Sequence, residues 1–500
     1  MLTVSMKATY PKEHYYALCI VAAHGCVMAV LFSFLSIHPD AADHWVWSRV
    51  MFNGYLEHPP MVAWMLHYFG LLFSDPVILL KVAPILMWET TYFILYLAVV
   101  RLYSERVGLV FLVILLSSPY FFAVVLLFHI TTPMMLFFSI FTLLLAELFN
   151  NNSDDKKAHE NYLLIIGAVL GLALLSKLLT IFFYIALVLF LALVPANRKY
   201  FFKWQTYAAP MISLAITIPY ILWNIETEWM SFLYQINRGF QNEIDIKSAG
   251  VYLISQVAYG VILVPVFWYL FCRKAFWTMN YHAQRLTIFW LALFAVPFIL
   301  FLYSASTGGH MDIQWLNFGY IGIFILGANF LSAQLTTTRL NRLLAVAFAV
   351  NLVVVSIIFS NILFRSLHSL VESHSDRSQD WIDWDKTASD ISSLFLSKHQ
   401  NLPDIIITKF YDKGGALSLY LSNHPLPFSI KKPMRNQWIT EESLQSAKGI
   451  ALLCKPDECA ENIIQTEKLI ARNLTLLGRS ITRHSYSNEV IREFVIYIPE

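Results

Sequence analysis

The residue types best able to do chemistry in this chain lie close together between positions 40 and 60. Asp40 and Glu57 supply carboxylates that can accept a proton, and Arg49 and His58 supply groups that can hold an anion. Positions 59–60 are Pro-Pro, which removes two backbone donors and biases His58 toward an extended conformation. The stretch therefore predicts a polar cleft built at a stiff bend.

Trp45 and Trp47 lie among these polar residues, Trp64 follows them, and long apolar runs stand on both sides of the stretch. Tryptophan rings favour the headgroup level of a bilayer, so the cleft is expected at a membrane surface. A juxtamembrane amphipathic helix with a snorkelling arginine would contain the same residue types. Residue types alone leave both interpretations open.

Apolar runs of membrane-spanning length recur along the chain. Of its 500 residues, 57% are hydrophobic and only 14% are charged, which is far from the composition of an ordinary soluble domain. The first run, 17–37, is followed by no Ala-x-Ala cleavage site, so we expect a retained helix. The sequence predicts a polytopic α-helical membrane protein with about eleven transmembrane helices. The other runs are 76–100, 107–128, 132–149, 162–175, 178–194, 206–223, 251–271, 286–303, 315–331 and 343–364.

The distribution of basic residues favours one topology. A cytoplasmic amino terminus places Lys and Arg in most inner loops, as the positive-inside tendency requires, and an odd helix count leaves the carboxyl-terminal part outside. The polar loops then gather at the outer end of the bundle, which predicts a site on the extracytoplasmic side of the inner membrane. A net charge of +2 without a long basic run gives no indication of nucleic-acid binding.

The order of residues in the first loop resembles a known family. An acidic residue, then Trp-x-Trp-Ser at 45–48, Gly-Tyr at 54–55 and Glu-His-Pro-Pro at 57–60 are similar to the first outer loop of the polyprenyl-phosphate-sugar glycosyltransferases of the GT-C superfamily, which includes protein O-mannosyltransferase-like and lipid A aminoarabinose transferase-like enzymes. The resemblance runs from about residue 30 to 430. Its other landmarks are 117–119, 131–133, 175–177, 219–239 and 309–315.

The resemblance implies roles for individual residues. Asp40 matches the acidic residue taken as the catalytic general base, which would accept the proton of the acceptor hydroxyl while lipid phosphate leaves from the opposite face, with inversion. Lys177 matches a family lysine expected to hold the donor phosphate. The remaining candidates for phosphate or substrate binding are Arg49, Tyr55, Glu57, His58 and His310.

Two positions depart from the family pattern by losing a carboxylate. Ala41 stands where relatives usually have Glu, and Met134 stands where they usually have Asp. Glu57 and Asp312 are candidates to compensate, with His310 as a nitrogen donor. A divalent cation held by these three residues stays open, although no close ligand spacing indicates one. Asp43 aligns with an aromatic position, so we expect Asp43→Asn to be tolerated far better than Asp40→Asn.

Residues 370–500 are polar and are expected to form a small extracytoplasmic α/β domain, whereas residues 1–369 form the transmembrane catalytic domain with a large first outer loop at 38–75. Gly414 and Gly415 are expected in a turn before a helix. Cys454 and Cys459 are close enough in sequence to form a disulfide, but nothing in the sequence requires one.

The sequence therefore predicts a membrane glycosyltransferase that moves a sugar from a polyprenyl-phosphate donor to an acceptor hydroxyl on lipid A, lipopolysaccharide, another glycan or a protein. A transporter or lipid flippase is the alternative, because it too would need many spans and polar residues. Transporters place such groups near the bilayer midplane and often repeat internally, whereas these groups lie at one membrane edge. A binding scaffold would leave the first loop unexplained.

Overall fold

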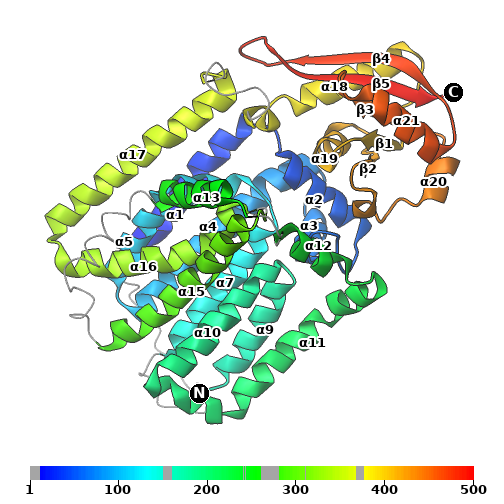
Figure 1. Ribbon diagram of the computed structural model, residues 1–500. Coiled ribbons are helices and arrows are strands. Elements are labelled where there is room, and N and C mark those ends of the chain that lie inside the picture. Colours follow the sequence, from blue (N-terminus) through cyan, green and yellow to red (C-terminus); the bar gives the residue numbers. More distant parts are fainter. Residues whose placement is uncertain are drawn as a thin grey trace, which may run out of the picture. The chain divides into compact units, whose positions relative to one another are not determined.

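The computed structural model describes residues 12–149, 160–239, 241, 244–260, 281–309, 311–367 and 377–500. The chain, coloured by residue number in Figure 1, forms two compact units. The first unit comprises Met1–Met28, Leu86–Val125 and Pro133–Val354, and the second comprises Ala29–Ile85, Leu126–Thr132 and Val355–Glu500.

Apolar helices build the first unit, and α1, α4, α7 and α17 also contribute residues to the second. Their bounds are α1 (Lys12–Ser33), α4 (Pro76–Leu102), α5 (Glu105–Leu116), α6 (Pro119–Ala123), η1 (Val124–Leu126), α7 (Thr131–Phe149), α9 (Tyr162–Leu174), η2 (Leu178–Thr180), α10 (Ile181–Leu193), η3 (Pro195–Phe202), α11 (Trp204–Glu226), α12 (Met230–Gly239), α13 (Ile246–Gly260), α15 (Tyr281–Ser306), η5 (Ile313–Leu316), α16 (Asn317–Gln334) and α17 (Thr337–Phe364).

Among the described residues, seven helices are long and apolar enough to cross a membrane, or up to nine if each of two bent pairs is one span. The bends fall where Pro119 and Pro195 begin a new helix and end the preceding one. Helix α9 is a shorter apolar helix, and the predicted run 251–271 continues outside the described residues. The prediction of a polytopic helical membrane protein with a small C-terminal α/β domain is confirmed.

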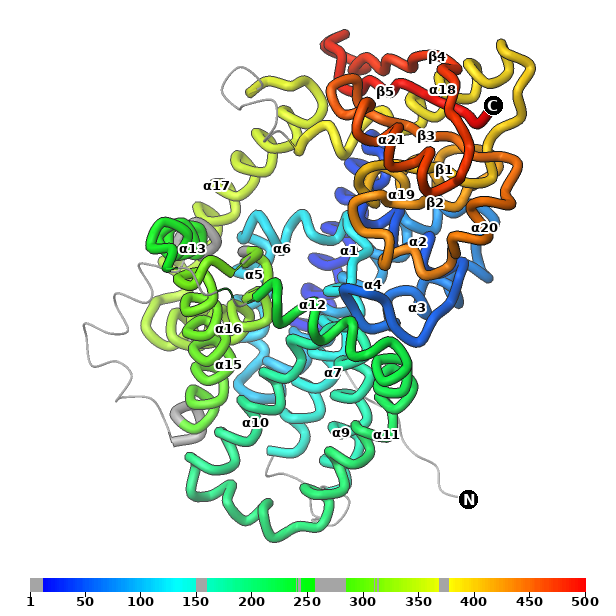
Figure 2. Tube along the Cα trace, turned by 45° about the vertical axis from the view of Figure 1, so that its right-hand side comes forward, coloured from blue at the N-terminus to red at the C-terminus, as the bar shows by residue number. Residues whose placement is uncertain are grey.

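Small residues let two of these helices approach closely. Helices α9 and α11 lie side by side in Figures 1 and 2, and a Cβ atom on Gly167 would collide with the backbone of Ala209. A Cβ atom on Gly171 would likewise lie only 3.0 Å from the backbone of Ser213. Contact between small residues is how apolar helices associate where no water drives them together.

The second unit contains a five-stranded sheet with the order β2-β1-β3-β5-β4. Strands β2, β1 and β3 are parallel, and β5 is antiparallel to both β3 and β4. The elements of this unit are α2 (Pro39–Val50), α3 (Met61–Gly70), η7 (Ser378–Trp381), α18 (Trp384–Ser397), β1 (Ile405–Thr408), α19 (Tyr411–Tyr420), β2 (Leu426–Ser429), η8 (Pro433–Arg435), α20 (Glu441–Ser446), β3 (Ile450–Cys454), α21 (Cys459–Ile470), β4 (Leu474–Arg483) and β5 (Val490–Pro499).

Alternating strand residues give this sheet two apolar faces. On one face Ile406 and Leu453 pack with Trp384 of α18 and Leu417 of α19. On the other face Ile407 and Leu452 belong to a separate core with residues of α20 and α21. Helices therefore cover both faces, which explains why the parallel strands β1 and β3 are almost entirely apolar.

Candidate functional site

Helix α2 carries the first acidic candidate. His38 caps its N-terminus by accepting the backbone N–H of Asp40 on Nδ1 at 3.2 Å, and Pro39 occupies the first turn, where it needs no donor. Asp40 lies in that turn, so the positive end of the helix dipole faces its carboxylate. Arg49 lies in the last turn, the favourable end for a cation.

A buried cluster of charges ties the first loop to the C-terminal part of the same unit. Arg435 donates to Asp43 Oδ2 at 2.6 Å and also bonds to Glu57. Lys432 donates to the other oxygen of Glu57 at 2.7 Å. The guanidinium of Arg435 lies over the Tyr411 ring, 3.5 Å from its centroid. These contacts form the Arg435 cluster, which consists of Asp43, Glu57, Tyr411, Lys432 and Arg435.

The Arg435 cluster sets the ionisation of its carboxylates. Burial raises the pKa of Glu57, but Arg435, His58 and Lys432 outweigh it and hold that pKa well below its usual range. Burial dominates at Asp43 and raises its pKa to about 6, against the opposing effect of Arg435. Both carboxylates are thus ionised at neutral pH and are already bonded to protein cations.

Close helix packing holds this arrangement together. A Cβ atom on Gly415 would lie 2.9 Å from the Asp43 backbone, so α19 can approach α2 this closely only with glycine at that position. Gly414 and Gly415 lie inside α19, and the prediction of a turn before a helix was wrong. Their role is to allow close contact between two helices, which an isolated Gly-Gly pair does not reveal.

Asp40 differs from the other two acidic residues in its exposure. Its side chain is 37% exposed, whereas those of Asp43 and Glu57 are 3% and 6% exposed. Partial burial raises the pKa of Asp40, His38 lowers it, and the nearby charges of Asp412 and Asp380 raise it further. Asp40 is therefore a carboxylate that a hydroxyl can reach and whose basicity the surrounding acids increase.

Three histidines lie near this loop in the second unit. The His44 ring meets the His129 ring edge-on at 5.1 Å, and the His58 ring lies 6.5 Å from His129. Burial lowers the pKa of His44 to about 3, so this imidazole is neutral at physiological pH. In the part of the chain that the structure describes, no group of three or more His, Cys, Asp or Glu side chains has a metal-binding arrangement.

Tyr55 and Arg49 also have protein partners. The Tyr55 hydroxyl donates to the Trp47 carbonyl at 3.0 Å, and its ring stacks on the Trp47 ring at 4.2 Å. Arg49 donates to Ser418 Oγ at 3.3 Å and lies over the Trp45 ring. Tyr55 thus fixes the loop after α2, while the half-buried Arg49 keeps donors for a second partner.

The first unit holds the lysine predicted to bind the donor. Lys177 occupies the extended break between α9 and η2 and is 5% exposed. Burial lowers its pKa to about 8, while Asp312 raises it and Arg238 lowers it. Asp312 accepts from Arg238 at 3.1 Å, so these three residues form one charged group. His310 lies outside the described residues.

Sequence reasoning missed several members of these groups. Arg435, Lys432 and Asp380 lie hundreds of residues from the first loop and belong to no motif. The available signal was Asp43 at a position that is aromatic in relatives, because a buried carboxylate there requires a cation. Glu57, a candidate to compensate for the lost carboxylates, is bonded to Arg435 and Lys432.

Comparison with known proteins supports the fold and its enzyme class. Residues 57–223 match the family model described as dolichyl-phosphate-mannose-protein mannosyltransferase. The chain is similar to ArnT from Cupriavidus metallidurans bound to undecaprenyl phosphate, with 13% identity, coverage of 96% of this chain and 97% of that one, and a TM-score of 0.66. The apo structure of that protein gives 15% identity, coverage of 96% and 98%, and a TM-score of 0.64. No curated protein matches in sequence. The resemblance predicted from the sequence is therefore confirmed: residues 57–223 match a mannosyltransferase family model, and the chain shares its fold with ArnT.

Proposed function

We propose that this protein transfers a sugar from a polyprenyl-phosphate donor to an acceptor hydroxyl on the outer face of the inner membrane. The observation that carries the proposal is the contrast among three acidic residues of the first loop. Asp43 and Glu57 are buried and bonded to Arg435, whereas Asp40 is partly exposed at the end of α2. Asp40 is therefore the member of this trio suited to meet a substrate.

The proposed reaction is a single inverting displacement. Asp40 accepts the proton of the acceptor hydroxyl as that oxygen forms a bond to the anomeric carbon. The bond between the anomeric carbon and the phosphate oxygen breaks, and the lipid phosphate leaves with the electron pair. Lys177, Arg49 and His58 are the cations proposed to hold the phosphate, with Tyr55, Glu57 and His310 as further substrate-binding or supporting residues. A metal at Glu57, His310 and Asp312 is not needed for these steps.

A lipid-linked donor agrees with the ligand of the structural relative, which was crystallised with undecaprenyl phosphate. A disulfide between Cys454 and Cys459 supports an extracytoplasmic position for residues 370–500, because such bonds persist in oxidising compartments. Acceptors of this class are lipid A, lipopolysaccharide, other glycans and protein hydroxyls. No observation here favours the alternative of a transporter or flippase.

The test is Asp40→Asn, with Asp390→Asn on the exposed face of α18 as the control. Asn retains the size of Asp but cannot accept the proton, so transfer should fall by about 10²–10⁴-fold. Binding of undecaprenyl phosphate to the purified variant should be unchanged. Transfer is measured by mass spectrometry of glycolipids and glycoproteins from a deletion strain that expresses each variant. Near-normal transfer by Asp40→Asn would remove Asp40 as the base.

A further inference from the structure

We propose that the C-terminal α/β domain binds an acidic sugar in a pocket at the carboxyl ends of β1 and β3. The pocket has a volume of about 200 Å³, and its walls come entirely from the second unit. This volume is below the several hundred Å³ of typical drug-sized sites, so it suits one sugar unit and not a lipid chain. The charged and aromatic residues of its lining include Lys409, Phe410, Lys455, Glu458, Arg492 and Phe494.

The position of the pocket follows from the strand order. From β1 the chain continues through α19 to β2 on one side, whereas from β3 it continues through α21 toward β4 and β5 on the other. Helices α19 and α21 cover opposite faces of the sheet. Adjacent parallel strands whose connections diverge in this way leave a crevice at their carboxyl ends, and ligands of open α/β sheets bind there.

The charges around the pocket favour an anion. Three of its carboxylates already have cationic partners: Asp380 pairs with Lys413 at 2.6 Å, Glu458 with Lys409 at 3.2 Å, and Glu493 with Arg479 at 3.6 Å. Within the described part of the chain, neither Lys455 nor Arg492 has a carboxylate within ion-pair distance. Arg492 is buried and bonds to backbone carbonyls instead. The lining therefore holds four cations and three carboxylates, and the exposed Lys455 is the cation most available to an anionic ligand.

Two helix ends add to this preference. The N-cap residues of α19 and α21, Phe410 and Glu458, line the pocket, and neither side chain accepts a hydrogen bond from the first turn of its helix. Backbone N–H groups at such ends favour anionic ligands. Phe410 is 39% exposed, and the ammonium groups of Lys409 and Lys431 lie 5.6 and 4.9 Å from the centroid of its ring, so this side of the pocket offers apolar surface next to positive charge.

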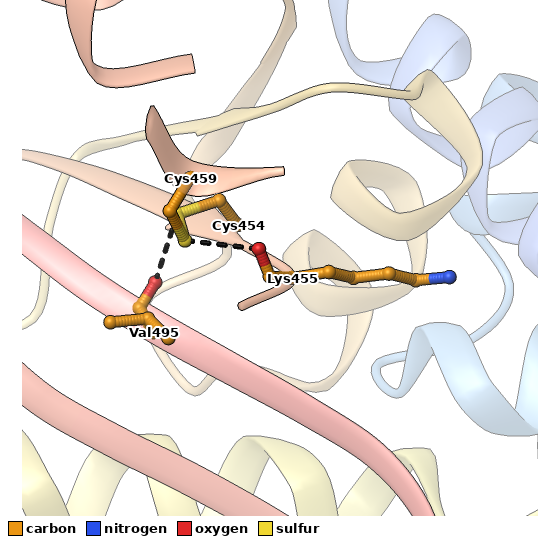
Figure 3. The surroundings of a disulfide bond; sticks show 4 residues. All are labelled: Cys454, Lys455, Cys459 and Val495. Atoms are coloured by element: carbon orange, nitrogen blue, oxygen red, sulfur yellow. Dashed lines mark hydrogen bonds between the residues drawn. A yellow bond between two sulfur atoms is a disulfide. The ribbon is translucent and has the colours of Figure 1, made fainter. Parts of the chain in front are cut away.

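A disulfide fixes one wall of the pocket. Cys454 at the end of β3 is bonded to Cys459 at the start of α21, and the intervening loop carries Lys455 and Glu458. Figure 3 shows the Lys455 side chain extending away from this bond. Cys459 Sγ also lies 3.0 Å from the Lys455 carbonyl. The loop that presents the lysine is thus held in place before a ligand arrives.

The pocket also adjoins the surroundings of the proposed base. Asp380 lines the pocket, and its charge affects the pKa of Asp40. His38 Nδ1 lies 3.8 Å from Asp40 Oδ2, and the His38 ring packs at 4.8 Å against the ring of Trp381, the residue that follows Asp380. An acidic sugar in the pocket would therefore be part of the acceptor, which places a phosphate or carboxylate near the hydroxyl that is glycosylated. This acceptor role rests on the proposed function, whereas the binding does not.

Binding can be measured without donor or transfer, which separates this proposal from the proposed function. Glucose 6-phosphate, glucuronate, glucose and inorganic phosphate would each be titrated into the purified full-length protein by calorimetry or ligand-observed NMR. At least one acidic sugar should bind more tightly than glucose and inorganic phosphate. A preference for glucose 6-phosphate would identify a phosphorylated acceptor, and a preference for glucuronate would identify a uronic acid.

Variants then locate the site. Lys455→Glu reverses an exposed charge and should weaken acidic-sugar binding at least tenfold, while Lys468→Glu, on the exposed side of α21, should change it less than twofold. Phe410→Ala should weaken the binding of glucose 6-phosphate more than the binding of inorganic phosphate. The proposal is overturned if no acidic sugar binds, if glucose or inorganic phosphate binds equally well, or if Lys455→Glu behaves like its control.

Discussion

Replacing Arg435 by Gln should destabilise the second unit more at neutral pH than at acidic pH. Arg435 is 3% exposed and bonds to both Asp43 and Glu57. Removing one partner of a buried ion pair costs about 3–5 kcal/mol, because an uncompensated charge remains. Since about 1 kcal/mol shifts the melting temperature by roughly 2–4 °C in a unit of 150–250 residues, we expect a decrease of about 6–20 °C at pH 7.5.

The pH dependence identifies the cause of this loss. In the unsubstituted protein, the pKa of Glu57 is lower in the folded state than in the unfolded state. Its contribution to folding stability is therefore fully present above the unfolded pKa and is lost as pH falls through the folded pKa. The pKa of Asp43 is raised to about 6, so folding is favoured as pH falls through that value. Without Arg435 the folded-state pKa values of Asp43 and Glu57 both rise. Protonation of these two carboxylates at lower pH then removes the uncompensated charge that destabilises the variant. The difference between parent and variant should therefore shrink as pH falls from 7 to 5.

The assay is thermal unfolding of detergent-solubilised protein at four pH values, followed by intrinsic fluorescence. Arg479→Gln is the matched control, because its guanidinium is 63% exposed and its pairing with Glu493 should contribute less than about 1 kcal/mol. A loss in Arg435→Gln that does not change with pH would show that Arg435 acts through shape and not through charge. That result would refute the assignment of the Arg435 cluster as an ionic one.

The remaining predictions concern the donor cation and the topology. Lys177→Ala should weaken donor use at least tenfold with little change in folding, and normal donor affinity and turnover would reduce Lys177 to a membrane anchor. A reporter active only outside the cytoplasm should be active when fused after residue 370 and silent when fused after residue 157. Cytoplasmic signal from the residue 370 fusion would refute the outer position of the site.

The helices and the order of the first loop could be predicted because both depend on local sequence. Each described helix of spanning length overlaps an apolar run, and the bend near His58 follows from the two prolines after it. The bent pairs were less predictable. At 195 a proline starts a new helix, but composition does not show whether the two pieces form one span.

The partners of the first loop could not be predicted, because they depend on contacts between residues far apart in sequence. Asp43 and Arg435 are 392 positions apart, and nothing local identifies one as the partner of the other. The structure also changes the expected control experiment. Asp43 is buried and bonded to Arg435, so Asp43→Asn should reduce stability even if it leaves the chemical step intact.

This chain lacks two carboxylates that relatives usually have, so other charges must act on the pKa of Asp40. Ala41 lies in α2, and Met134 is fully buried in α7, so neither position supplies an acid. The negative charge that raises the pKa of Asp40 comes instead from Asp412 and Asp380, which belong to the C-terminal part of the second unit. A base benefits from a raised pKa as long as it stays ionised, because it then holds the transferred proton more strongly. With Asp40 as the proposed base, Asp412 and Asp380 would contribute to the chemistry by adding to the effect of burial on the pKa of Asp40.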